Sequence, residues 1–115
     1  EGAGPAYFNY YHSKDPFETD GGYSDTTPVG FYNGKKYGDF QTFDAKSPYG
    51  LYDMAGNVGE WTGNLLYKVH YRHIRGGSKA TYAIDARLWK TNSAQPEYAS
   101  PSTGFRCARD PVTKK

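Results

Sequence analysis

The chain has 115 residues and a formal net charge of +2, and 17% of its residues are aromatic. Ile, Leu and Val together number 10 and Phe adds 6, so these side chains are as scarce as in many disordered proteins. The low net charge and the abundance of rings argue against disorder. The composition therefore predicts one loop-rich domain over residues 1–115, with a core built mainly from aromatic rings.

Several function classes are excluded by the sequence. No apolar run approaches the roughly 18–20 residues that span a bilayer, so we expect no transmembrane segment in this chain. Adjacent Lys or Arg residues occur only at 35–36 and 114–115, which is unlike the basic surface of a nucleic-acid-binding protein. Cys107 is the only cysteine, which excludes an internal disulfide and a multi-cysteine zinc site. Because the chain begins at Glu1 without a leader, we expect a processed product or a piece of a longer protein.

The N-terminal half predicts mostly turns and loops. Gly, Pro and Asn interrupt residues 1–50 every few positions, which is typical of irregular structure. An aromatic stretch at 7–11 predicts a short strand, and the segment 28–32, followed by Asn33-Gly34, predicts the start of a hairpin.

The C-terminal half predicts a few short strands. Four apolar residues follow the spacing of a helical face: Leu51, Met54, Ala55 and Val58. Gly56 and Gly59 interrupt this pattern, and each costs about 1 kcal/mol relative to Ala in a helix, so we expect an irregular turn that leads into a strand around 60–62. Beyond it we expect a strand within 69–78, a strand or one helical turn within 81–89, and a last short strand at 104–109.

Three motifs carry a resemblance to a known family. They are the segment 48–62 (Pro-Tyr-Gly-Leu-Tyr-Asp-Met-Ala-Gly-Asn-Val-Gly-Glu-Trp-Thr), Arg75-Gly-Gly-Ser78 and Gly104-Phe-Arg-Cys-Ala108, with Thr27-Pro-Val-Gly30 upstream. In this order they resemble the formylglycine-generating, sulfatase-modifying-factor family, over the C-terminal part of its domain. The resemblance implies an α+β, C-type-lectin-like fold that is loop-rich with short antiparallel strands and is truncated here. Since part of such a domain buries little surface, we expect another chain or a larger assembly to supply the rest, unless the fold is a reduced version.

The family's oxidase chemistry is not expected from this chain. Oxidase members use two cysteines between the Gly-Gly-Ser and Gly-Phe-Arg motifs to bind copper(I), which thiolates favour. The interval 79–103 contains no Cys, so we predict no copper and no catalytic residues. Sulfoxide synthases of the family hold iron with histidines of a separate helical domain, so we expect no iron either. His70 and His73 would point to opposite faces of an extended segment, and we interpret them as surface or packing residues.

A calcium site is predicted around 53–60, where two carboxylates bracket a glycine-rich turn. Calcium takes six to eight oxygen ligands, including carboxylates and backbone carbonyls. The resemblance implies that the ligands are Asp53, the carbonyls of Gly56 and Val58, and Glu60. The alternative is that Asp53 caps a turn and that Glu60 pairs with a base such as Arg75.

The resemblance implies a second calcium site with a shifted spacing. Its ligands would be the Asn9 side chain, the Tyr10 carbonyl, Asp20 and the Gly22 carbonyl. The alternative is that Asn9 satisfies backbone groups and that Asp20 forms a turn.

The remaining large side chains are assigned to structure. We expect Trp61 and Trp89 in the core, because rings must replace the missing aliphatic residues. Arg75 and Arg106 are predicted either to be buried ion-pair anchors or to line a groove.

These features leave three functional hypotheses. The first is a non-catalytic, calcium-stabilised structural or interaction subunit of a larger protein assembly, with other protein subunits as partners. The alternative is a lectin-like module that binds a carbohydrate or a peptide on a surface of four residues: Tyr82, Arg87, Trp89 and Asn92. A further alternative is the C-terminal piece of a cleaved or longer enzyme of the family. Weak calcium sites suit extracellular modules, so we expect a periplasmic or extracellular location.

Overall fold

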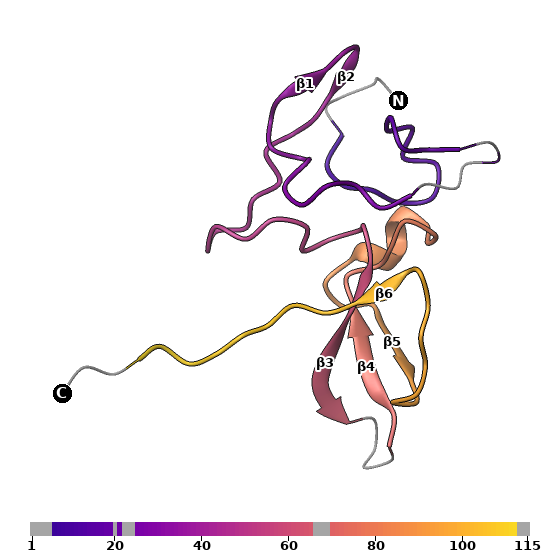
Figure 1. The fold of residues 1–115 in the computed structure, drawn as a ribbon, viewed down its shortest axis with the longest axis vertical. Helices are drawn as coiled ribbons and strands as arrows, with labels where there is room; N and C mark the ends of the chain where they lie inside the picture. Colours follow the sequence, from indigo (N-terminus) through magenta and orange to yellow (C-terminus); the bar gives the residue numbers. More distant parts are fainter. Residues whose placement is uncertain (1–5, 20, 22–24, 66–69, 113–115) are drawn as a thin grey trace.

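The computed structural model describes residues 6–19, 21, 25–65 and 70–112 (Figure 1). Its elements are short and in chain order are β1 (Lys36–Tyr37), β2 (Phe40–Gln41), β3 (Gly59–Leu65), β4 (Arg72–Arg75), the 3-10 helix η2 (Ala83–Ala86), β5 (Thr91–Ala94) and β6 (Thr103–Gly104). No α-helix occurs within the described residues. The loop-rich body with short strands agrees with the predicted fold, and the helical turn predicted within 81–89 is η2.

A four-stranded sheet forms the C-terminal half, in the order β5-β4-β3-β6. Strands β3, β4 and β5 are antiparallel, with Trp61 opposite Ile74, whereas β6 runs parallel to β3. The strands predicted around 60–62 and within 69–78 are therefore confirmed as β3 and β4. Sequence analysis missed β5, because Thr-Asn-Ser-Ala has only one β-branched residue and little β propensity.

Loops and one small hairpin make up the N-terminal half. The hairpin lies further along the chain than predicted: residues 28–32 form no strand, a bridge joins Asn33 to Asp44, and β1 and β2 turn at Gly38-Asp39 rather than at Asn33-Gly34. The strand predicted at 7–11 is wrong, because this segment bonds to loops instead. The Asn9 carbonyl accepts the N–H of Asn57, at 3.0 Å, and the Tyr11 N–H bonds to the Thr81 carbonyl.

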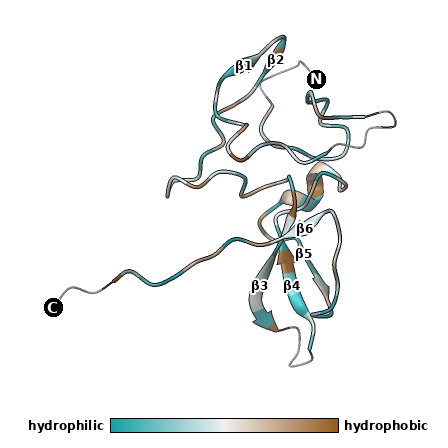
Figure 2. Cartoon of the chain, viewed as in Figure 1, coloured by the Kyte–Doolittle hydropathy of each residue, from teal (hydrophilic) through white to brown (hydrophobic). Residues whose placement is uncertain are grey.

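Aromatic rings build the core, as the composition predicted. Phe31 is 7% exposed, stacks on Tyr37 with ring centroids 4.3 Å apart, and meets Phe17 edge-on. Within the described residues only Phe31, Tyr32 and Ile74 count as buried hydrophobic side chains. Figure 2 shows the hydrophobic residues as short separate segments rather than one continuous layer.

The two tryptophans contribute less to the core than expected. Trp61 is half-buried on β3, where its ring lies edge-on to Tyr98. Trp89 is 67% exposed, so its predicted core position is wrong. Its neighbour Leu88 is also almost fully exposed.

The C-terminal residues form an extended arm, which we define as residues 105–112. Figure 1 shows the arm running away from the body of the molecule. The strand predicted at 104–109 is wrong beyond Gly104, since β6 pairs with β3 only at Gly59–Thr103 and Glu60–Gly104. No other strand among the described residues accompanies the arm, and Phe105 is 77% exposed.

Candidate functional site

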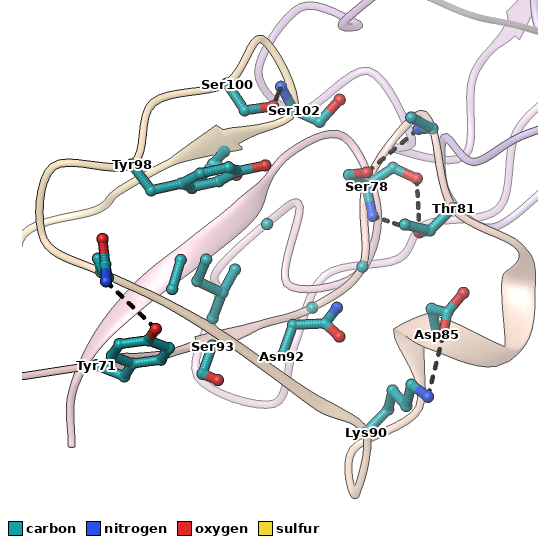
Figure 3. A pocket seen from close by; sticks show the side chains of 18 of the residues that line it. Tyr71, Ser78, Thr81, Asp85, Lys90, Asn92, Ser93, Tyr98, Ser100 and Ser102 are labelled. Carbon is teal, nitrogen blue, oxygen red and sulfur yellow. Dashed lines mark hydrogen bonds and ion pairs between the residues drawn. The ribbon is translucent and has the colours of Figure 1, made fainter. Parts of the chain in front are cut away.

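A groove of about 850 Å³ lies beside the four-stranded sheet. Its walls come from β4, β5, the turn at 76–81, the start of η2 and the loop between β5 and β6 (Figure 3). Most of its lining comes from the interval between the Gly-Gly-Ser and Gly-Phe-Arg motifs, where the resemblance puts the catalytic cysteines of oxidase members. Here the groove has no thiol, because that interval contains no Cys.

Hydroxyl and amide groups dominate the polar lining of the groove. Tyr71 and Tyr98 lie at one end in Figure 3, and the Tyr71 hydroxyl accepts a hydrogen bond from Gln95. At the other end Lys90 and Asp85 form an ion pair, with nitrogen and oxygen 3.6 Å apart. Asn92 extends into the space between the two ends. The site therefore combines two rings, neutral hydrogen-bonding groups and a largely neutralised charge.

The four residues predicted as a ligand surface do not all line this groove. Asn92 lines the groove, but Tyr82, Arg87 and Trp89 are not among its lining residues. Tyr82 instead packs edge-on against Tyr11, with centroids 5.4 Å apart. The groove residues that were missed, such as Ser93 and Tyr98, lie on and after β5, the strand that sequence analysis did not predict.

The loop 53–60 joins three segments of the chain. Gly56 donates its N–H to the Gly76 carbonyl, at 2.7 Å, and the Asn57 side chain bonds to both the N–H and the carbonyl of Thr27. Asp53 accepts the N–H of Gly30 at 2.9 Å. The alternative interpretation, in which Asp53 caps a turn, therefore agrees with this hydrogen bond to the turn at Gly30.

Glu60 pairs with Arg106 rather than with Arg75. Both carboxylate oxygens accept hydrogen bonds from the Arg106 guanidinium, at 2.6 Å each, and the same group bonds to the carbonyls of Tyr52 and Asp53. The hydrogen bond to Glu60 raises the pKa of Arg106. Arg75 lies opposite Glu60 in the sheet register, but its guanidinium bonds to the Leu88 carbonyl. Arg106 therefore anchors an ion pair as predicted, but it is not buried, because its side chain is 33% exposed. The prediction is wrong for Arg75, whose guanidinium bonds to a carbonyl instead.

The oxygen donors of this loop are of the type that calcium prefers. Asp53 and Glu60 both already accept hydrogen bonds, but each carboxylate oxygen has two acceptor sites, so one hydrogen bond does not use all of its capacity. A calcium ion bound here would share Glu60 with Arg106. The calcium ligation of Asp53, Gly56, Val58 and Glu60 stays a prediction.

Asn9 lies in a second polar cluster. It is 1% exposed, and its amide nitrogen donates to Asp15, at 2.7 Å, and to the Asp25 carbonyl. Asp15 is also buried, and it accepts hydrogen bonds from Ser13 and from the Tyr32 hydroxyl. Burial, and next the bond to Asp15, raises the pKa of Tyr32.

This cluster contains an observation that fits a cation. The Asn9 side-chain oxygen is buried and has no hydrogen-bond partner among the described residues. Because the amide nitrogen faces two acceptors, the atom without a hydrogen bond is the oxygen, and an amide oxygen is an atom type that calcium binds. Asp20 and Gly22, the other half of the predicted set with Tyr10, lie outside the described residues. This site also stays a prediction.

No group of three His, Cys, Asp or Glu side chains that would hold a metal occurs in the described part of the chain. His73 lies on β4 with its Nδ1 buried and without a partner there, whereas His70 is exposed. Nor does any helix within the described ranges have the length and apolarity needed to cross a membrane.

Comparison with known proteins identifies the family. The profile of the sulfatase-modifying factor enzyme 1-like domain matches residues 2–111. The chain belongs to this family. The formylglycine-generating-enzyme family had been inferred from the motifs, and both the family and its fold are confirmed.

Relatives of this chain carry the names of a protein kinase, an inactive enzyme and an enzyme. The serine/threonine-protein kinase pkn1 of Chlamydia caviae is 34% identical over 104 residues, which cover 75% of this chain and 15% of the relative. The inactive C-alpha-formylglycine-generating enzyme 2 of Bos taurus is 37% identical over 73 residues, 57% of this chain and 24% of the relative. The formylglycine-generating enzyme of Mus musculus is 29% identical over 130 residues, 93% of this chain and 31% of that enzyme. The chain therefore spans less than a third of these relatives.

Two solved structures share the fold. Treponema denticola variable protein 1 superposes with a TM-score of 0.53 at 22% identity, over 87% of this chain and 34% of its own. The protein CarF gives a TM-score of 0.53 at 24% identity, over 90% of this chain and 32% of its own.

Proposed function

We propose that this member of the formylglycine-generating-enzyme family is a non-catalytic interaction module, a structural subunit of a larger protein assembly. The interval that would carry the family's two catalytic cysteines has none. A relative named as an inactive formylglycine-generating enzyme supports the view that the domain exists without the activity.

The apolar surface of the module is the observation that carries this proposal. Among the described residues, large hydrophobic side chains are exposed mainly in loops along the chain, including Val29, Tyr49 and Leu88 at 90% or more. A stable monomeric domain rarely leaves so much of its apolar surface in water, and extensive exposed patches mark interaction sites.

The arm supports the same proposal. Residues 105–112 are all exposed, and Phe105 places a ring in solvent at the point where the arm leaves β6. An extended segment with unpaired backbone groups is suited to pair with a strand of another polypeptide. Cys107 lies on the arm and is exposed, so it reports directly on whether the arm is covered.

Calcium is proposed to stabilise the module through the loop 53–60 and the Asn9 cluster. The carboxylates of Asp53 and Glu60 and the unpartnered oxygen of Asn9 support this part of the proposal. Sites of this kind fill where calcium is millimolar, which agrees with a periplasmic or extracellular location.

The test is native mass spectrometry of the protein from its source, combined with alkylation of Cys107 by iodoacetamide. We expect an assembly heavier than the 12.9 kDa chain, in which Cys107 reacts slowly until the assembly is dissociated. A free chain of that mass, with Cys107 as reactive as in denaturant, would refute the proposal. A heavier denatured chain would mean that the covering polypeptide belongs to the same protein, and would favour the longer-enzyme alternative.

A further inference from the structure

From the chemistry of its lining, we infer that the groove beside the sheet is a binding site for a neutral saccharide. This assignment rests on the proposed non-catalytic role, because it treats the groove as a site of binding without turnover. A volume of about 850 Å³ lies within the range of ligand pockets, roughly 300–1,000 Å³.

The charges of the groove argue against an anionic ligand. Among the described lining residues Lys90 is the only Lys or Arg, and it already pairs with Asp85 at 3.6 Å. Glu97 is the remaining charged lining residue and is negative. An anionic ligand would therefore meet no unpaired cation, and it would lose hydration without an opposite charge to compensate.

The neutral groups match the chemistry of a sugar. A saccharide carries hydroxyls that both donate and accept, and ring faces of C–H groups that pack on aromatic rings. Asn92 lies opposite Ile74 in the sheet register and offers both a donor and an acceptor from one amide. Figure 3 shows the rings of Tyr71 and Tyr98 toward one side of Asn92, and each combines an apolar ring with a polar hydroxyl.

The two rings are accessible and held in place. Tyr71 is 38% exposed and Tyr98 is 48% exposed, so each retains a free surface. Gln95 bonds to the Tyr71 hydroxyl at 3.3 Å, and Trp61 packs edge-on against Tyr98. Rings that are already positioned lose little conformational freedom when a ligand binds, which favours binding.

The experiment is saturation-transfer NMR on the protein as it is isolated, with any associated polypeptide retained. The probes are maltotriose, lactose and N,N′-diacetylchitobiose, with glucuronic acid as the anionic comparison, each at up to about 10 mM because weak binding is expected. We expect transfer to the ring protons of at least one neutral probe and none to glucuronic acid. Absence of binding by all three neutral probes, or stronger binding of the acid, would overturn the assignment.

Variants locate the binding on the groove. Asn92→Ala removes an exposed amide at an edge strand and is expected to weaken binding at least tenfold while the protein remains folded. Tyr98→Ala is expected to do the same, and Tyr49→Ala, at an exposed ring outside the groove, is the matched control. Binding that survives both groove variants would reject the site. If the sugar binds and is also turned over, the non-catalytic role is rejected but the assignment of the groove as a sugar site stands. If a free monomer binds the sugar, only the subunit role is rejected.

A peptide is the competing occupant, because β5 is an edge strand. A library of extended peptides is therefore added to the protein with its bound saccharide. If the peptides displace the saccharide at a lower concentration than any neutral sugar does, the saccharide assignment is overturned in favour of a peptide.

Discussion

Asp15 shows how far single polar side chains determine this structure. It is 4% exposed, and its carboxylate accepts hydrogen bonds from Asn9, Ser13, Tyr32 and the N–H of Phe17. A buried carboxylate is tolerated only with such a set of donors, since an unpaired one is costly. In a chain with few aliphatic residues, this network connects the N-terminal loops to the aromatic core through Tyr32.

The raised pKa of Tyr32 predicts a loss of stability at alkaline pH. The unfolded chain ionises this tyrosine at about pH 10, whereas the folded chain retains the proton, so the free energy of unfolding should fall as the pH rises above about 10. Tyr32→Phe is expected to lower the free energy of unfolding by about 1–3 kcal/mol near neutral pH, and to make its alkaline decline shallower.

Urea unfolding at a series of pH values measures both effects. Tyr49→Phe is the matched control, because that ring is 91% exposed. Identical alkaline declines in the wild type and in Tyr32→Phe would contradict the assignment.

Arg106 makes a second prediction at this scale. Its fork bonds to both oxygens of Glu60 and to two carbonyls, a geometry that Lys does not reproduce. Because the pair is partly exposed, Arg106→Lys should cost only about 1 kcal/mol in the free energy of unfolding. Denaturant titration measures this change, with Arg109→Lys on the exposed arm as the control. If both variants change the free energy of unfolding equally, Arg106 does not act as an anchor.

At the scale of elements, the loop 53–60 depends on one glycine. Gly56 has a φ of +76°, and a Cβ there would overlap the carbonyl oxygen of Asn9. Gly56→Ala is therefore expected to destabilise the fold by more than about 1 kcal/mol. Gly63→Ala on β3 is the comparison, since a Cβ there meets no atom within 4 Å. Thermal unfolding that ranks the two variants equally would contradict this view of the loop.

The calcium proposal is also tested at the loop 53–60. Calcium that binds the folded state at 100 times its dissociation constant should raise the free energy of unfolding by about 2.7 kcal/mol. We expect calcium to raise the melting temperature, EGTA to reverse the rise, and Asp53→Asn to reduce it. Magnesium is the matched control, because it prefers a stricter octahedral geometry. If calcium does not change the melting temperature of the wild type, the calcium part of the proposal is refuted.

The sequence predicted elements where local signals were strong. The strand around 60–62 and the strand within 69–78 follow apolar and β-branched residues, and Gly76-Gly77 lies directly after β4. The strand at 104–109 failed, because pairing depends on a neighbour and β3 accompanies the chain only as far as Gly104.

The site was less accessible to sequence reasoning than the fold. The partner of Glu60 is 46 positions away, and no local pattern distinguishes Arg106 from Arg75. The groove depends on how β5 and the following loop lie beside β4, which is a matter of tertiary structure. Asp15 had a signal in Asp15-Pro16, but that pair indicates only a turn.

At the scale of the whole molecule, the chain is flat and extended. Its radius of gyration is 15.5 Å and its extents are 45 × 42 × 22 Å. A compact chain of this length would have a radius of gyration of about 13 Å. The larger radius of gyration agrees with the exposed rings and the projecting arm. It is also expected if another polypeptide covers the apolar surface, as the subunit proposal requires.

The fixation of Arg106 sets the mechanical limits of the arm. Four hydrogen bonds attach this residue to Glu60, Tyr52 and Asp53, so the described residues 107–112 lie beyond the attachment point. Six extended residues reach about 20 Å. A partner that pairs with residues 107–112 would therefore contact them within about 20 Å of Arg106.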